Sequence, residues 1–243
     1  MMIMKYLSIV LFCFFSFESI GQNLSSHKLH RISQTAPNNT EMDAFDIVEY
    51  FKTKTNNPKK LVLLFVYWIT QNISYDVDKY LSGDKTYTTV RETLETRKTL
   101  CQGYSELFYE LCNYADIDCK IINGYAKGFD FNGKPFKDTN HIWNAVLIDN
   151  KWELVDVTWA MGFLSYRKGR LVFNKIFRGE YVFAKPDYFI LTHYPTDSKW
   201  QLLNKPITAD TFFGKKNERI EQDANKIDKQ VKLEIDKLQK LIH

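Results

Sequence analysis

The sequence has no large excess of charge of either sign, no internal repeat, and no cluster of cysteine and histidine. Its 243 residues include 33 basic and 29 acidic side chains, a net charge of +4, and no stretch gathers the basic residues into a patch. We therefore expect no nucleic-acid partner. The chain contains neither a CxxC pair nor histidine and cysteine at metal-ligand spacing, so we expect no metal and no organic cofactor.

One apolar run stands out, and it lies at the N-terminus. Lys5 precedes an apolar stretch at residues 7–17, and residues 19–21 place small side chains at the −3 and −1 positions of a cleavage site before Gln22. This layout is typical of a secretory signal peptide, and the stretch is too short to span a bilayer core of ~30 Å. We expect residues 1–21 to be removed and the mature protein to be extracytoplasmic (periplasmic or secreted), without stable membrane insertion. The alternative is an uncleaved N-terminal membrane anchor.

The rest of the chain divides into one folded domain and two flanking polar segments. Residues 22–42 are polar and are expected to form a loose leader, whereas residues 43–208 have a length that suits one domain with a full core. Residues 209–243 are expected to form a charged amphipathic C-terminal helix, with apolar residues recurring from Ile220 to Ile242. This helix could dock on the domain, bind a partner or a second copy, or remain solvated.

The order of the predicted elements favours an α+β fold. Apolar residues at helical spacing come first and predict helices over residues 43–55, 58–72, 90–97 and 101–114. The period then changes, and strands are predicted over residues 119–126, 141–148 and 152–157, with shorter ones around 170–172, 181–183 and 188–191. Helices followed by an antiparallel sheet indicate α+β rather than parallel α/β.

The turn at Asp149 and Asn150 fixes the pairing of the two strands that flank it. With these residues at the turn, His141 and Asp156 fall on one face of the hairpin as diagonal neighbours, together with apolar residues such as Trp143. Diagonal neighbours lie ~7–8 Å apart at the backbone, within reach of an imidazole–carboxylate hydrogen bond. Because a lone aspartate on a core face is costly to bury, His141 is its expected partner.

Cys101 is expected at the first turn of helix 101–114, on the same face as its apolar stripe. Free N–H groups and the helix dipole favour an anion such as a thiolate there. If that stripe packs on the hairpin face, Cys101 meets His141 with Asp156 behind it, in the order nucleophile, base and orienter. The Cys101 backbone N–H could supply one oxyanion donor. The Trp68 indole could supply another, or it could simply be part of the core.

Taken one at a time, these residues also have structural explanations. Cys101 could fill the core, His141 could be a hydrogen-bonded core histidine, and Asp156 could be a turn or cap residue. Only the joint prediction that all three face one another favours catalysis. The other histidine considered, His193, lies beside Pro195 in an expected turn with no acid in a comparable register.

Three cysteines remain once residues 1–21 are removed, so at least one thiol is free or pairs between chains. Cys112 and Cys119 could form a disulfide, or they could be two small buried side chains. Cys101 is the candidate reactive thiol.

Several segments resemble the transglutaminase-like superfamily. Residues 96–104 resemble its nucleophile segment, residues 141–146 its histidine strand, and residues 152–159 its aspartate strand. Further segments resemble the kyphoscoliosis-peptidase branch of that superfamily, at residues 124–128, 193–195 and 200–203.

The resemblance implies a papain-like α+β core, with the nucleophile helix packed on an antiparallel sheet, and thiolate attack on a carboxamide or peptide carbonyl. A thioester would form on Cys101, and His141 would protonate the leaving amine. Leu100 departs from the family pattern, which often has a small residue before the cysteine, so we expect narrower access to the thiol.

Together these features predict an exported cysteine acyl-transfer enzyme of transglutaminase-like type, with Cys101, His141 and Asp156 as catalytic residues. Hydrolysis of protein or peptide amides is favoured over cross-linking, which uses the same thioester. The alternative is a non-catalytic secreted protein-binding module on this fold, with the C-terminal helix as its interaction element. The loop at residues 128–140 carries three phenylalanines just before His141, so it is either a specificity loop or an ordinary packed loop.

Overall fold

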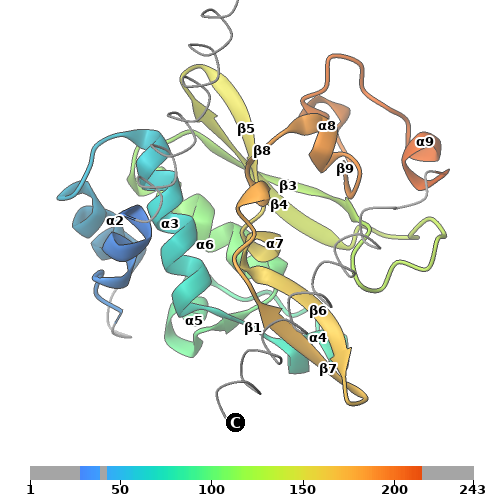
Figure 1. Ribbon diagram of the computed structural model, residues 1–243, viewed down its shortest axis with the longest axis horizontal. Helices are drawn as coiled ribbons and strands as arrows, with labels where there is room; N and C mark the ends of the chain where they lie inside the picture. Colours follow the sequence, from blue (N-terminus) through green and yellow to red (C-terminus); the bar gives the residue numbers. More distant parts are fainter. Residues whose placement is uncertain (1–27, 39–42, 215–243) are drawn as a thin grey trace, which may run out of the picture.

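The computed structural model describes residues 28–38 and 43–214 (Figure 1). The expected signal peptide, the first residues of the leader and the C-terminal helix beyond residue 214 lie outside the described residues. No helix among the described residues is long and apolar enough to cross a membrane. The fold has a layer of helices on one side of an antiparallel sheet and shorter elements on the other side (Figure 1).

The four helices predicted within the described residues are present, as α2 (Ala44–Lys52), α3 (Pro58–Asn72), α5 (Val90–Thr96) and α6 (Cys101–Tyr114). Three of them begin at a side chain that accepts a hydrogen bond from the first turn, namely Asp43, Asn57 and Thr89. Among the described residues, no side chain caps α6 in this way. The first N–H groups of α6 therefore stay available to another acceptor.

The central sheet has five antiparallel strands in the order β8-β5-β4-β3-β9. They are β3 (Cys119–Ala126), β4 (His141–Ile148), β5 (Lys151–Val155), β8 (Val182–Ala184) and β9 (His193–Pro195). In the β4–β5 hairpin, Ile148 pairs with Lys151, which confirms the register predicted from the turn. Asp149 and Asn150 have φ values of 50° and 61°, as a type I′ turn requires.

The remaining elements are short: β1 (Ser74–Tyr75), α4 (Val77–Ser82), β2 (Lys98–Thr99), α7 (Val157–Met161), β6 (Gly162–Arg167), β7 (Arg170–Lys175), η1 (Gly179–Tyr181), α8 (Pro186–Phe189), η2 (Ser198–Gln201) and α9 (Ala209–Gly214). β1 and β2 form a parallel pair, and β6 and β7 form a separate antiparallel pair.

Three details of the strand prediction are wrong. The strand expected over 152–157 ends at Val155, because Asp156 accepts a hydrogen bond from the Trp159 backbone N–H and so begins α7. The strand expected around 188–191 is replaced by α8 and the turn after it, because a proline in the first turn favours a helix. His193, expected in a turn, is the first residue of β9.

Helix α6 packs on the face of the hairpin opposite to the predicted one. The Asn144 side chain donates a hydrogen bond to the Ser105 carbonyl of α6, so the Asn144 face contacts the helix. Neighbouring residues of a strand point to opposite faces, and Trp143 packs against Phe189 of α8 instead. Cys101 and His141 still line one cavity, because each is the first residue of an element that begins beside it.

The described part of the leader is not loose. Residues 28–34 are helical, and Leu29 and Ala36 are buried in the hydrophobic core. The hydroxyl of Ser33 accepts a hydrogen bond from Gln71 of α3. A few apolar residues at helical spacing are thus enough to dock a segment that is otherwise polar.

Candidate active site

A cavity of about 980 Å³ lies where α6, the start of β4 and the β6–β7 hairpin approach one another. Its walls carry a thiol, an imidazole and many aromatic rings, including Tyr75, Cys101, Phe129, His141, Trp159 and Tyr166. A cavity of this size is at the upper end of ordinary ligand pockets, so a segment of several residues of a peptide would fit it.

Cys101 lines this cavity as the first, half-buried residue of α6. The next two residues, Gln102 and Gly103, fix the start of the helix. The Gln102 amide bonds both backbone groups of Thr88, accepting from the N–H at 3.0 Å and donating to the carbonyl at 3.2 Å. Gly103 packs on Thr99 of β2, where a larger side chain would overlap the threonine hydroxyl. The thiol is therefore held at an uncapped helix N-terminus that faces the cavity.

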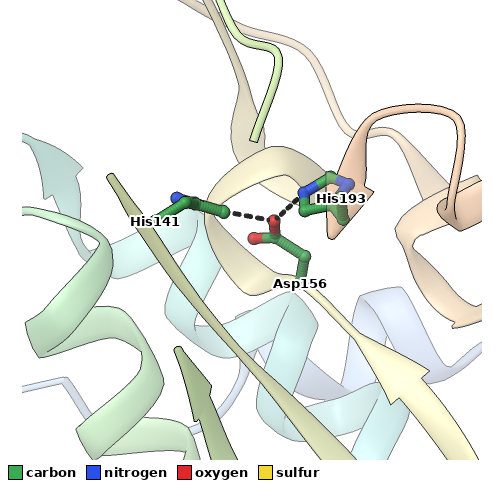
Figure 2. A group of neighbouring side chains, drawn as sticks. All are labelled: His141, Asp156 and His193. Carbon is green, nitrogen blue, oxygen red and sulfur yellow. Dashed lines mark hydrogen bonds and ion pairs between the residues drawn. The ribbon is translucent and has the colours of Figure 1, made fainter. Parts of the chain in front are cut away.

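His141 connects the thiol to a buried carboxylate. Its Nε2 lies 2.6 Å from Oδ2 of Asp156 (Figure 2), and its side chain lines the same cavity as Cys101. Asp156 is fully buried, and its other oxygen, Oδ1, accepts a hydrogen bond from the Trp159 backbone N–H at 2.9 Å. The structure thus pairs His141 with Asp156, as the sequence predicted, and places Cys101 on the same cavity as His141.

Charge and hydrogen bonding set the protonation states of this pair. Burial alone would lower the pKa of His141, but the Asp156 carboxylate and the Cys101 side chain outweigh burial and raise that pKa to about 10. Burial alone would raise the pKa of Asp156, but His141 and His193 hold it well below its usual range. Near neutral pH, Asp156 is therefore an anion and His141 a cation. A cation in this position stabilises a neighbouring thiolate.

His193 is the member of the site that sequence reasoning missed. Its Nε2 lies 3.0 Å from Oδ2 of Asp156, the same oxygen that His141 contacts (Figure 2). It comes to this place because β9 pairs with β3, with Ala126 opposite His193. That pairing joins segments far apart in the sequence, and a three-residue strand carries no periodicity. The one available signal was the resemblance of residues 193–195 to the kyphoscoliosis-peptidase branch.

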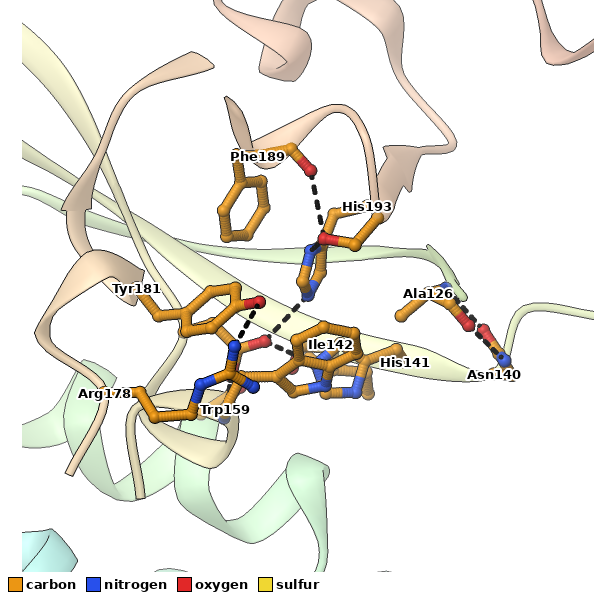
Figure 3. Close-up of polar contacts among 12 residues, drawn as sticks. Ala126, Asn140, His141, Ile142, Trp159, Arg178, Tyr181, Phe189 and His193 are labelled. Atoms are coloured by element: carbon orange, nitrogen blue, oxygen red, sulfur yellow. Dashed lines mark hydrogen bonds and ion pairs between the residues drawn. The ribbon is translucent and has the colours of Figure 1, made fainter. Parts of the chain in front are cut away.

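The loop before His141 is anchored at both ends. Asn140 accepts from the Ala126 N–H at 2.8 Å and donates to the Ala126 carbonyl at 3.0 Å (Figure 3). Phe129 and Phe136 of this loop line the cavity, and the ring of Phe129 lies 5.2 Å from that of Tyr166 in β6. The loop and the β6–β7 hairpin therefore contact each other beside the candidate site.

Trp68 and the other two cysteines are core residues. The Trp68 side chain is fully buried and donates its indole N–H to the Pro37 carbonyl at 3.3 Å, so it is not a second oxyanion donor. Cys112 and Cys119 are buried free thiols next to each other, and burial raises the pKa of Cys112 well above its ordinary value. In the structure both are small buried side chains with free thiols, one of the two alternatives that the sequence left open.

Side-chain accessibility predicts a selective labelling pattern. At about pH 6.5, we expect iodoacetamide to modify Cys101 at least about tenfold faster than Cys112 or Cys119, because Cys101 faces the cavity while the other two are buried. Peptide mapping of the alkylated protein by mass spectrometry over time measures the three rates. Equally slow labelling of all three thiols would instead favour a non-catalytic module.

His141, Asp156 and His193 bring three potential metal-ligand atoms within 4.8 Å of one another. The nitrogen–oxygen distances of 2.6 and 3.0 Å are, however, hydrogen-bond distances. They are shorter than the ~3.3 Å that separates ligands placed ~2.0 Å from a tetrahedral zinc ion. The cluster is therefore arranged as a hydrogen-bonded network around one carboxylate.

The family comparison agrees with this site. Residues 46–157 match the family model of the transglutaminase-like superfamily, and that region contains Cys101, His141 and Asp156. Residues 46–157 therefore form a transglutaminase-like domain, and the fold is the α+β fold expected from the sequence.

Curated relatives define the branch within that superfamily. The chain is 36% identical over 147 residues to kyphoscoliosis peptidase of Mus musculus, which covers 60% of this chain and 22% of that protein. It is 32% identical over 158 residues to Hillarin of Drosophila melanogaster, which covers 60% of this chain and 19% of that protein. Within that superfamily, the matched region is similar to the kyphoscoliosis-peptidase-like branch. It spans about a fifth of the length of these relatives.

A solved structure of a candidate cysteine protease from Cytophaga hutchinsonii is also similar. It has 22% sequence identity and a TM-score of 0.36, and the similarity covers 55% of this chain and 37% of that chain.

Proposed function

We propose that the protein is an exported cysteine acyl-transfer enzyme that hydrolyses protein or peptide amides, with Cys101, His141 and Asp156 as its catalytic residues. The observation that carries the proposal is that Cys101 and His141 line one cavity while a buried carboxylate holds the imidazole from behind. Export rests on the signal-like pattern of residues 1–21.

The geometry supports a reaction in two stages. The Cys101 thiolate adds to the carbonyl carbon of the scissile amide, and the backbone N–H of Cys101 at the start of α6 donates to the developing oxyanion. His141 then gives its proton to the leaving nitrogen, the C–N bond breaks, and an acyl thioester remains on Cys101. Neutral His141 next takes a proton from water as the water oxygen attacks the thioester, which releases a carboxylic acid and restores the thiolate.

The cavity walls favour a polypeptide substrate. Aromatic rings from the loop, the hairpin and α7 surround the thiol, and Phe129 and Tyr166 contact each other at one side of the cavity. Aromatic surface binds apolar side chains, while the size of the cavity accommodates flanking residues. We therefore assign the loop at residues 128–140 a role in substrate selection.

Trapping the acyl-enzyme tests this proposal. We expect an electrophilic peptide library to label Cys101, and amide versions of the labelled peptides to yield carboxylic acids, because water resolves the thioester. Intact mass spectrometry with added methylamine separates the two acyl-transfer outcomes. Methylamide products in place of acids would identify a cross-linking enzyme, and the absence of any Cys101 adduct would refute acyl transfer.

The second candidate function is a secreted protein-binding module that does not turn over substrate. It is favoured by Leu100, which lines the cavity beside Cys101 at a position that often carries a small residue in this family. Leu100→Ala separates the two functions. If Leu100 narrows the entrance to an active thiol, the electrophilic peptides should label Cys101 faster in Leu100→Ala. If the thiol is inert, the rate of labelling should not change.

A further inference from the structure

Asp156 receives three hydrogen bonds, more than an orienting carboxylate needs for one histidine. His141 and His193 both contact Oδ2, at 2.6 and 3.0 Å, and the Trp159 backbone N–H contacts Oδ1 at 2.9 Å. The carboxylate is fully buried, so each of these donors replaces a lost water contact. Of the two histidines, only His141 lines the cavity together with Cys101.

Packing fixes the His193 ring independently of its contact with Asp156. The ring is completely buried, is stacked on Phe189 with centroids 4.0 Å apart, and meets Trp159 edge-on at 4.4 Å. Its Nδ1 lies 2.7 Å from the Thr192 hydroxyl. A ring packed against two aromatic side chains and hydrogen-bonded at both nitrogens presents Nε2 at one fixed point.

A glycine in β3 allows β9 to approach this closely. Gly124 pairs with His141 on one side and with Pro195 on the other. A Cβ atom at Gly124 would lie 2.4 Å from the Trp143 ring and 2.3 Å from the Tyr194 carbonyl. Any larger residue would therefore separate the strand that carries His141 from the strand that carries His193.

His193 is a neutral donor. Burial lowers the pKa of His193 to about 4, in spite of its hydrogen bond with Asp156. Because the Asp156 carboxylate offers only acceptors, the single ring proton of neutral His193 lies on Nε2. The Thr192 hydroxyl has one proton and lies 2.7 Å from Nδ1 but 3.4 Å from the Phe189 carbonyl, so in this tautomer it donates to the closer Nδ1.

We propose that His193 is a positioning residue that holds Oδ2 of Asp156 at the point where it orients the His141 ring toward Cys101. This inference rests on the proposed function for its catalytic consequence but not for the contact itself. A neutral donor leaves the charge of Asp156 intact and removes its freedom to rotate, whereas a second cation would compete with His141 for that charge.

Two substitutions separate the donor from the ring. His193→Phe keeps a flat ring against Phe189 but removes the donor, and we expect kcat to fall by about 10- to 100-fold, the effect of losing one hydrogen bond to a charged group, with KM nearly unchanged. His193→Gln places an amide N–H near the position of Nε2, and we expect it to restore kcat to within a few-fold of the original value. A His193→Phe enzyme with the original kcat would overturn the inference.

Proton and nitrogen NMR of the intact protein supplies a readout that a structural role would not change. We expect a strongly deshielded proton from the short His141–Asp156 bond, retained in His193→Gln and lost or broadened in His193→Phe. In protein labelled with ¹⁵N-histidine, we expect His193 to be the neutral Nε2–H tautomer at pH 7. A charged or Nδ1–H ring would overturn the inference even if the phenylalanine variant did not fold.

The same measurements distinguish failure of this inference from failure of the proposed function. If Cys101→Ala retains full amide hydrolysis, the proposed function is wrong, while the tautomer of His193 and the deshielded proton still test its contact with Asp156. If Cys101→Ala is inactive and His193→Phe is fully active, only the role of His193 is wrong.

Discussion

Replacing Cys101 by alanine is expected to lower kcat/KM for amide hydrolysis by about 10⁵-fold or more, because no other described thiol lines the cavity. The loss should appear without a large loss of stability, because Cys101 is half-buried at the first turn of α6 and alanine is a good helix former. Steady-state assays with peptides identified by thioester trapping, together with thermal unfolding, measure both effects.

Cys112→Ala is the matched control for that experiment. Cys112 lies in the same helix, three turns further on, and its side chain is fully buried away from the cavity. We expect this variant to lose stability and to keep its turnover per folded molecule. If Cys101→Ala retained wild-type turnover, the thiol at the start of α6 would have no part in the reaction.

Asp156→Asn is expected to lower kcat by about 10³- to 10⁴-fold while the fold is kept. Three donors point at this side chain, from His141, His193 and the Trp159 backbone. An amide has only one acceptor oxygen, so the asparagine side chain has two possible orientations. In one orientation its NH₂ group faces both histidines, and in the other its NH₂ group faces the Trp159 backbone N–H. When the NH₂ group faces the histidines, Nε2 of His141 must accept a hydrogen bond, so the ring proton lies on Nδ1, which is the wrong tautomer for catalysis. Asparagine still caps α7, so the helix should form.

The pH dependence of this variant gives a second, independent measurement. The Asp156 charge raises the pKa of His141 against the effect of burial, so removing that charge lowers the pKa from about 10. The alkaline limb of kcat/KM should therefore move to lower pH in Asp156→Asn. Asp187→Asn makes the same substitution at an exposed position in α8 and should leave both kcat and the pH profile unchanged. Wild-type turnover in Asp156→Asn would exclude Asp156 from the mechanism.

Local sequence patterns predicted the helices and the central hairpin well, because their causes are local. The apolar spacing and the Asn57 cap before Pro58 define α3, and the turn at Asp149 and Asn150 defines the register of β4 with β5. That register placed His141 beside Asp156. The contact follows from counting residues across a two-residue turn, so it needs no knowledge of the rest of the fold.

Other features of the site were not predictable in this way. Which face of the hairpin receives α6 depends on what covers each face, and the pattern of β4 is buried on both faces. The prediction chose the Trp143 face, whereas Asn144 contacts the helix. The docking of residues 28–38 on the core likewise depends on the surface that α3 presents to them. The polar composition of residues 28–38 does not reveal that surface.

The sequence by itself determined that a thiol begins a helix and that an imidazole and a carboxylate lie at the same end of one hairpin, because both facts follow from short-range patterns. Only the tertiary structure decided that a second histidine completes the group. His193 reaches Asp156 through the pairing of β9 with β3 and through packing on Phe189 and Trp159. Contacts of that kind join segments with no common period, so they arise only when the whole core assembles around a carboxylate that must be hydrogen-bonded to be buried.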